Sequence, residues 1–384
     1  MSQVTLLFVS HYAGFYGANK SLLTLMTLLR ECHGIKPIVL LPARGAMCKA
    51  LEKNNIDYKV QHYYWWVNYD QGFFQWLLNK RKQWRNCRKV KAMRSVFNGE
   101  KIDLVYSNSV CVNVGFLLAK RLGVPHIWQF RESLTQFSLS LSLPLSLSLW
   151  SSQVNKRYVL ISNYMMSYYS RYLPKERMVR VYNGVDLPQG VARNEENELR
   201  GRLQVACVGV LCGQKNQMEL LQAQNLLHRR GVDIDVWFMG SCNDMEYGKQ
   251  MISFAEREGL IELVHIVGHT DKVFEMLQKM NLGVVAARDE AFGRVTIEYM
   301  LMQMPVVVSQ SGANLELVEV GVTGDSYELH DVESLADRIE QYVCHPNLLK
   351  SQGEAASRIA REKFSAGQNA ELIFEQIESV LKKD

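Results

Sequence analysis

Short apolar runs alternate with helix-length segments along nearly the whole chain, and this alternation most limits how the chain can fold. In the first half, predicted strands cover residues 4–10, 37–41, 103–107, 126–130 and 158–161, and one more begins at residue 179. Each is short and apolar and is followed by a stretch long enough for a helix. Such an order favours a parallel sheet with helices on both faces.

A polar, charged stretch at residues 189–202 interrupts the pattern and is the predicted linker between two domains. The alternation then restarts, with predicted strands at residues 203–210, 234–239, 264–267, 282–286 and 305–309, and becomes wholly helical from residue 334. We therefore predict an α/β protein of two Rossmann-like, doubly wound domains that face each other across a cleft. Their bounds are 1–188 and 203–365, and a helix at 366–384 is expected to pack back on the first domain.

Composition supports a two-domain globular protein. A chain of 384 residues can bury two cores, and 47% hydrophobic with 22% charged residues is ordinary. The eight cysteines show no CxxC spacing, which predicts reduced, mostly buried thiols and a cytoplasmic protein. The N-terminus is interpreted as a first strand rather than a signal peptide, and no apolar run predicts a membrane span.

The stretch from Glu290 to Glu298 carries the strongest functional signal. It follows a predicted strand and opens a predicted helix after Gly293, where free amides such as that of Val295 and the helix dipole attract an anion. A nucleotide diphosphate is such an anion, and the two carboxylates suit sugar and ribose hydroxyls at its ends. The same residues also fit a plain helix start with a surface ion pair between Arg294 and Glu298.

The spacing of these two glutamates resembles the E-x7-E motif of glycosyltransferase family 4, whose members have the GT-B fold and retain the anomeric configuration. Further stretches resemble this family in its own order over residues 180–340. They are Asn183-Gly184-Val185-Asp186, the loop from Gly209 to Lys215, Gly268 with Asp271 and Val273, Met304 to Ser309, and Ser311-Gly312-Ala313-Asn314-Leu315-Glu316.

The resemblance implies a role for each matching residue. Glu290 would face the donor sugar as a catalytic residue, and Glu298 would bind the nucleotide ribose. Lys215 would pair with the diphosphate and compensate the charge that builds as the nucleotide leaves. Backbone amides near Phe292 and Gly293 would assist.

The first domain matches the family more loosely. Gly14 and Gly17 lie in a loop similar to the family's glycine-rich loop on the phosphate side. Where many relatives have His-Asp, this chain has Arg131-Glu132. Arg131 could contact donor sugar or phosphate and Glu132 could face the acceptor, or the two could form an ion pair at a strand end.

One cation expected from the family is missing in the second domain. The arginine that usually follows the glycine of the phosphate loop is Val210 here. Arg294, or an arginine of the first domain, could take its place in binding the diphosphate.

Several other signals are weak. Residues 14–21 look like a P-loop, but Asn19 stands where the second glycine belongs. Asp233 and Asp235 form a DxD pattern at a strand start, which is more typical of a solvated strand end than of a metal site. Without histidine clusters of metal-ligand spacing we expect no metal and no cofactor. No motif indicates nucleic-acid binding.

A basic stretch suggests an anionic partner. Residues 80–94 hold eight Lys or Arg and no acid, and follow aromatic residues that include Trp65 and Trp66. This composition suits peripheral contact with an anionic membrane, on the inner face of that membrane for a cytoplasmic protein. A solvated helix face would have the same composition. Residues 138–150 alternate Ser and Leu around Pro144 and are either a loop packing its leucines inward or a lip that touches lipid or acceptor.

Together these features predict a retaining, metal-independent glycosyltransferase of the hexosyltransferase type. Its partners would be a nucleotide-diphosphate-sugar donor and a glycan or lipid-linked acceptor in bacterial surface polysaccharide synthesis. Two alternatives stay open: a nucleotide-sugar epimerase or hydrolase of the same fold, and a non-catalytic protein that binds nucleotide sugars.

Overall fold

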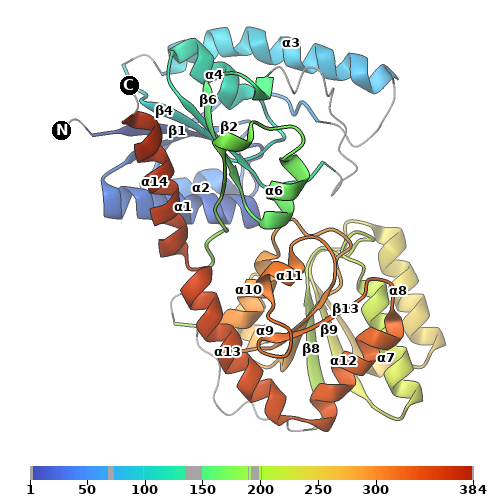
Figure 1. The fold of residues 1–384 in the computed structure, drawn as a ribbon. Helices are drawn as coiled ribbons and strands as arrows, with labels where there is room; N and C mark the ends of the chain where they lie inside the picture. The colour runs from blue at the N-terminus through green and yellow to red at the C-terminus, as the bar shows by residue number, and fades with distance from the viewer. Residues whose placement is uncertain are drawn as a thin grey trace. The chain divides into compact units, whose positions relative to one another are not determined.

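The computed structural model describes residues 3–67, 73–97, 99–134, 149–188, 190–191, 199 and 201–382. The chain divides into two compact units (Figure 1). Unit 1 comprises residues 1–184 and 366–384, and unit 2 comprises residues 185–365. The first segment of unit 1 thus ends four residues before the predicted end of the first domain, and the last helix of the chain belongs to unit 1.

Unit 1 is built on a seven-stranded parallel sheet of order β3-β2-β1-β4-β5-β6-β7. Its strands are β1 (Thr5–Val9), β2 (Lys36–Leu41), β3 (Asp57–Val60), β4 (Leu104–Ser107), β5 (His126–Phe130), β6 (Asn155–Leu160) and β7 (Met178–Arg180). Its helices are α1 (Gly17–His33), α2 (Ala46–Lys53), α3 (Phe73–Val96), α4 (Val114–Leu122), α6 (Asn163–Tyr169) and α14 (Ala366–Leu381). The central strands are buried on both faces, which is why they are continuous apolar runs.

Helix α14 completes one core of unit 1. Its apolar stripe, with Ile373 and Ile377 fully buried, packs with Leu25 and Leu29 of α1 and with Val159 of β6. Figure 1 shows α14 beside α1, in agreement with their contacts. The last helix of the chain is therefore part of unit 1.

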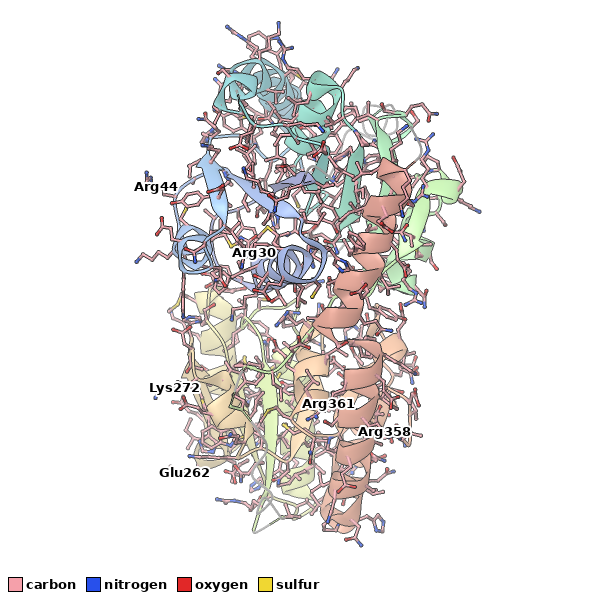
Figure 2. The ribbon with its side chains drawn as sticks, turned by 90° about the vertical axis from the view of Figure 1, so that its left-hand side faces the viewer. Arg30, Arg44, Glu262, Lys272, Arg358 and Arg361 are labelled. Atoms are coloured by element: carbon pink, nitrogen blue, oxygen red, sulfur yellow. The ribbon has the colours of Figure 1, made fainter. Side chains whose placement is uncertain are left out.

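Helices α1 and α2 are held together at their ends. Arg30 of α1, labelled in Figure 2, donates from Nη1 to the carbonyl of Asn54 just after α2, at 2.6 Å. Helix α1 then ends at Gly34, whose left-handed φ of 66° is typical of a helix C-terminus.

Unit 2 repeats the architecture with a six-stranded parallel sheet of order β10-β9-β8-β11-β12-β13. Its strands are β8 (Leu203–Val208), β9 (Ile234–Met239), β10 (Val264–Gly268), β11 (Leu282–Val285), β12 (Val306–Ser309) and β13 (Gly324–Tyr327). Its helices are α7 (Gln217–Arg229), α8 (Met245–Arg257), α9 (Val273–Leu277), α10 (Arg294–Leu301), α11 (Asn314–Leu317), α12 (Val332–Cys344) and α13 (Asn347–Lys363). Figure 2 shows Arg358 and Arg361 on α13, and both are exposed.

The turn at Asn183-Gly184 has a clear steric reason for its glycine. A Cβ on Gly184 would lie 2.5 Å from Cα of Ala366, at the start of α14. Beside this approach, the side-chain amide of Asn369 donates to the carbonyl of Tyr182 at 2.5 Å. Only glycine lets the two segments lie this close.

Some predictions about the fold need correction. The short edge strands β3 and β13 were not predicted. All eight cysteines are free, but only Cys48, Cys111 and Cys207 are buried, so the expectation that most are buried is wrong. Of the Ser-Leu segment, residues 138–148 lie outside the described residues. None of the described helices is long and apolar enough to cross a bilayer.

Candidate active site

The loop between β8 and α7 carries Lys215 at the carboxyl end of the unit 2 sheet. Gly209 starts this loop with a φ of 152°, and the position of a Cβ on it lies 3.7 Å from Cγ of Lys215. The side-chain amide of Gln217 donates to the carbonyl of Val210 at 2.9 Å. The loop is therefore held from the helix that follows it, and the lysine stem packs on its first residue.

A second loop, between β11 and α10, carries Glu290. Gly312 lies directly on it: a Cβ there would be 2.3 Å from the carbonyl oxygen of Glu290, and the φ of 60° also favours glycine. The next amide, that of Ala313, donates to the same carbonyl at 2.7 Å. The loop after β12 thus fixes the backbone of Glu290.

Helix α10 is anchored beside these loops by its tyrosine, Tyr299. The Tyr299 ring lies over Gly283, where a Cβ would approach it to 2.3 Å. Its hydroxyl accepts a hydrogen bond from the amide of Val208 at 2.7 Å. At the other end of the helix, Gly293 is the N-cap, with a left-handed φ of 93°. Gly293 and Val295 line a pocket with Cys207 and Val208, so the first turn of α10 lies close to the end of β8.

Four of the seven predicted site residues of unit 2 line one pocket, and Phe292, Arg294 and Glu298 are not among its lining residues. Lys215, Glu290, Gly293 and Val295 line one small pocket with Cys207. Within it, Nζ of Lys215 lies 2.6 Å from Oε2 of Glu290. Burial lowers the pKa of Lys215, but the Glu290 carboxylate more than offsets this, so the pKa stays above its ordinary value. The lysine is a full cation at neutral pH.

The other residues between Glu290 and Glu298 make different kinds of contact. Nε of Arg294 lies 2.8 Å from Oε1 of Glu298, so the ion pair considered from sequence is formed. The Phe292 ring is buried and meets Phe364 edge-on at 6.2 Å, which leaves its backbone as the part able to meet a ligand. Close to Gly293, Thr296 Oγ1 is buried without a hydrogen-bond partner in the described structure.

Sequence reasoning missed Arg288. This exposed residue follows β11, and its amide donates to the carbonyl of Gln214 at 3.0 Å while Nη2 donates to Oδ1 of Asn216 at 3.3 Å. It thereby joins the loop of Glu290 to the loop of Lys215 and adds a second cation beside them. The signal was present, since Arg288 lies two residues before Glu290 at the carboxyl end of a predicted strand.

In unit 1, Arg131 and Glu132 follow β5 and are buried. The Arg131 guanidinium donates to amide oxygens of Asn108 at 2.8 Å and Asn183 at 2.6 Å. Arg131 therefore braces the Asn183-Gly184 turn, a role that sequence reasoning did not anticipate.

The carboxylate of Glu132 lies among polar groups in a buried place. It accepts a hydrogen bond from the Ser109 hydroxyl at 2.9 Å and lies 3.7 Å from Nε2 of His11. Burial raises the pKa of Glu132 to about 7, against the lowering effects of Ser109 and Arg131. Burial, aided by Arg131, lowers the pKa of His11 to about 3. The histidine is therefore neutral at neutral pH, and the carboxyl holds its proton to a higher pH than an exposed glutamate does.

Gly17 is the first residue of α1, and the helix has no acidic residue in its first turn. The described residues contain no group of three or more His, Cys, Asp or Glu placed to hold a metal. The two aspartates of the DxD pattern are used structurally: Asp233 pairs with His228 at 2.6 Å, and Asp235 with Arg202 at 3.0 Å.

Two family profiles divide the chain between them. Glycosyltransferase Family 4 matches residues 15–189, and Glycosyl transferases group 1 matches residues 190–359. The chain is a family 4 glycosyltransferase. This chain is 25% identical over 279 residues to an uncharacterized glycosyltransferase, MJ1178, of Methanocaldococcus jannaschii. The alignment covers 72% of this chain and 75% of the relative.

Other relatives of the glycosyltransferase act in polysaccharide synthesis. It is 27% identical over 177 residues to a lipopolysaccharide core biosynthesis mannosyltransferase of Rhizobium leguminosarum bv. viciae, covering 46% of this chain and 50% of the relative. Among solved structures, Anabaena HepE in complex with UDP and glucose aligns over 98% of this chain and 100% of its own, with a TM-score of 0.79 and 20% identity. The two parallel-sheet units and this likeness establish the GT-B fold.

Proposed function

We propose that this enzyme is a retaining, metal-independent hexosyltransferase that moves a sugar from a nucleotide-diphosphate-sugar to a glycan or lipid-linked acceptor in bacterial surface polysaccharide synthesis. The pairing of Lys215 with Glu290 at 2.6 Å, beside the start of α10, carries the proposal. A cation, a carboxylate and the first turn of α10 lie around one small pocket, which supports the proposal of a bound diphosphate. HepE binds UDP and UDP-glucose, and a relative named for lipopolysaccharide core synthesis transfers mannose.

The diphosphate would bind between the cation and the helix start. Lys215 would exchange Glu290 for a phosphate oxygen, while the first amides of α10 donate to the other oxygens. Arg288 would supply the second cation, which the family pattern has at the position of Val210 and this chain lacks there. As the bond to the sugar breaks, charge builds on the diphosphate, and these fixed donors stabilise it without reorganising.

The two glutamates would bind the remaining parts of the donor. Glu290, released from Lys215, would accept hydrogen bonds from sugar hydroxyls, and Glu298 would do so from the ribose. The described side chains around this pocket offer no carboxylate besides Glu290, so we propose front-face attack by the acceptor with retention. In unit 1, Glu132 would face the acceptor and take up the proton of its attacking hydroxyl.

The test begins with a thermal-shift screen of UDP, GDP and their sugars, followed by transfer assays with the stabilising donor. We expect one nucleotide family to raise the melting temperature, and nucleotide to be released only when an acceptor is present. NMR should show that the product retains the anomeric configuration of the donor, and activity should be unchanged in the presence of a chelator. Release of nucleotide without an acceptor would instead favour a hydrolase or epimerase. Binding without turnover would favour a non-catalytic protein, and a strict need for Mg²⁺ or Mn²⁺ would contradict metal independence.

The proposal includes contact with an anionic membrane through α3. Its exposed face carries Leu77 and Trp84, 45% and 58% exposed, together with Arg81, Arg88 and Lys91. These positions recur every three or four residues and form one stripe of the helix. Apolar side chains flanked by cations suit the interface of an anionic bilayer. Trp65 and Trp66 do not belong to this stripe, because Trp66 is buried against Trp128 and Trp65 donates to the carbonyl of His11.

Cosedimentation with vesicles checks this part. The protein should bind phosphatidylglycerol-containing vesicles, weakly bind pure phosphatidylcholine, and lose binding as salt rises. Trp84→Ala should weaken binding, whereas Met245→Ala, which removes a side chain of similar exposure from unit 2, should not. Equal binding to both vesicles, or no effect of Trp84→Ala, would argue against the membrane contact.

A further inference from the structure

Four rings form a wall from the interior of unit 1 to its surface. Trp65 and His11 lie 5.5 Å apart between ring centroids, and His11 meets Tyr12 edge-on at 4.4 Å. Tyr12 is in turn stacked with Tyr16 at 6.2 Å, with 22° between the ring planes. The inner end is buried, since His11 is 7% exposed and lies beside Glu132, whereas Tyr16 is 66% exposed.

The loop that presents the outer rings is held from inside. Asn19, which is fully buried, donates from its side-chain amide to the carbonyls of Tyr12 and Gly14, at 3.1 and 2.6 Å. The Ser10 hydroxyl donates to Oδ1 of Asn19 at 2.7 Å. This bracing explains why asparagine stands at the position where a P-loop would have glycine.

A neighbouring segment holds the loop from its other side. The carbonyl of Ala13 accepts a hydrogen bond from the amide of Met47 at 3.0 Å. Gly45 packs so closely that a Cβ there would be 2.5 Å from the same oxygen. The loop that carries Tyr12 and Tyr16 is thus fixed by contacts on two sides.

Gly14 makes room for the stack. A Cβ on it would lie 2.8 Å from Cε2 of Tyr16 and 3.3 Å from Cδ2 of Tyr12. A single exposed aromatic residue needs no explanation. Here a braced loop holds two stacked rings, one of them largely open to solvent, beside a buried carboxyl. The loop thereby keeps a flat apolar surface exposed to water, which is unfavourable for hydration.

We infer that Tyr12 and Tyr16 form a subsite that stacks on a pyranose ring of the acceptor. The C–H face of a pyranose is flat and apolar and packs on aromatic rings, while its edge carries hydroxyls. A ring bound against Tyr16 and Tyr12 would direct a hydroxyl toward the buried end of the wall, where His11 and Glu132 lie. The inference rests on the proposed function and narrows the acceptor class to carbohydrate, as opposed to an acyclic hydroxy acid or polyol.

Saturation-transfer NMR tests the subsite directly. The probes are octyl glucosides, galactosides, mannosides and N-acetylglucosaminides in both anomers, with malate and glycerol as acyclic controls. In the wild-type protein, saturation should reach the ring protons of at least one glycoside and neither acyclic compound. Tyr16→Ala should weaken that signal and raise the concentration for half-saturation roughly three- to tenfold, the loss expected for one aromatic stacking contact.

Three variants separate stacking from general damage. Tyr16→Phe keeps the ring and should bind like wild type, and so should Met245→Ala, which removes an equally exposed side chain from unit 2. Gly14→Ala should displace the Tyr16 ring and reduce binding. No saturation of any glycoside ring, saturation confined to the octyl chain, or equal binding by Tyr16→Ala would overturn the inference.

Calorimetry with UDP and GDP on the same samples keeps the two hypotheses apart. If neither nucleotide binds the wild-type protein, the proposed function fails whatever the glycosides do. If a nucleotide binds equally well to wild type and Tyr16→Ala while glycoside binding is unaffected, only the pyranose subsite is rejected.

Discussion

Glu290→Gln should have opposite effects on nucleotide binding and on sugar transfer. The Glu290 carboxylate lies 2.6 Å from Nζ of Lys215, and the two side chains are 12% and 34% exposed. A diphosphate must compete for the same ammonium group. Removing the negative charge of residue 290 frees the lysine for phosphate, but it also weakens the acceptor of hydrogen bonds from the donor sugar.

The structure sets the size of each effect. Because the lysine is about one-third exposed, the pair is closer to a surface ion pair than to a buried one, worth roughly 0.5–1.5 kcal/mol. At ~1.36 kcal/mol per tenfold change, UDP or GDP should bind Glu290→Gln about two- to twelvefold more tightly by calorimetry. Transfer should fall by on the order of 100-fold or more, because the lost interaction stabilises the transition state.

A double-mutant cycle controls the interpretation. Lys215→Met keeps the apolar stem and removes the charge, so it should weaken nucleotide binding by itself. In that background Glu290→Gln should no longer tighten nucleotide binding, since no ammonium remains to be freed. Weaker nucleotide binding by the single variant Glu290→Gln, or near-normal transfer kinetics, would refute the reasoning.

Three further predictions concern loop placement, pH and the core. Gly312→Ala places a Cβ 2.3 Å from the Glu290 carbonyl and should lower kcat by roughly 100-fold. The control Gly321→Ala, at a similar φ of 78° with open space around it, should leave kcat unchanged, and similar kcat values for the two variants would contradict the packing argument. The raised pKa of Glu132, about 7, means that ionisation costs the folded state, so wild type should lose stability as pH rises from about 4.5 to 7. The stability of Glu132→Gln should not fall over this pH range, so by urea denaturation the variant should be up to ~3 kcal/mol more stable than wild type above pH 7. If the free energy of unfolding depends on pH in the same way for both proteins, the prediction is wrong. Ile377→Ala should cost about 2–5 kcal/mol because α14 is part of the unit 1 core, and an unchanged urea midpoint would show that α14 does not contribute.

Most of the strands that sequence predicted are buried on both faces, although the edge strands β7 and β10 were predicted as well. In β1, Leu7 lies in one core of unit 1 and Phe8 in another, so the strand stands out as an apolar run. β3 and β13 lie at sheet edges and have the sequences Asp-Tyr-Lys-Val and Gly-Asp-Ser-Tyr. Edge strands carry polar residues on their open side, so composition did not separate them from loops.

The candidate site was predictable in its residues but not in its contacts. Glu290 was identified from its place between a predicted strand and a predicted helix, and Lys215 from the resemblance to the family's phosphate loop; the two loops follow adjacent parallel strands. The ion pair between the two side chains depends on their rotamers and on the position of Gly312. The spacing of residues in the sequence carries no information about either. Likewise, Trp65 and Trp66 looked like part of a membrane surface, but an aromatic residue beside a basic helix can equally well be packed inside, as Trp66 is.

The charge pairs of unit 2 bear on how the donor would bind. Lys215 is paired with Glu290 and Arg294 with Glu298, so two of the three cations considered for the diphosphate are matched by a carboxylate proposed for hydroxyls. An unpaired carboxylate and an unpaired ammonium in a half-buried pocket would each be costly. Pairing removes that cost, and donor binding then exchanges one set of charge contacts for another instead of creating them anew. Arg288, which is exposed and bonded to a neutral amide, needs no such exchange, so it is the cation that a diphosphate can meet first, before Lys215 leaves Glu290.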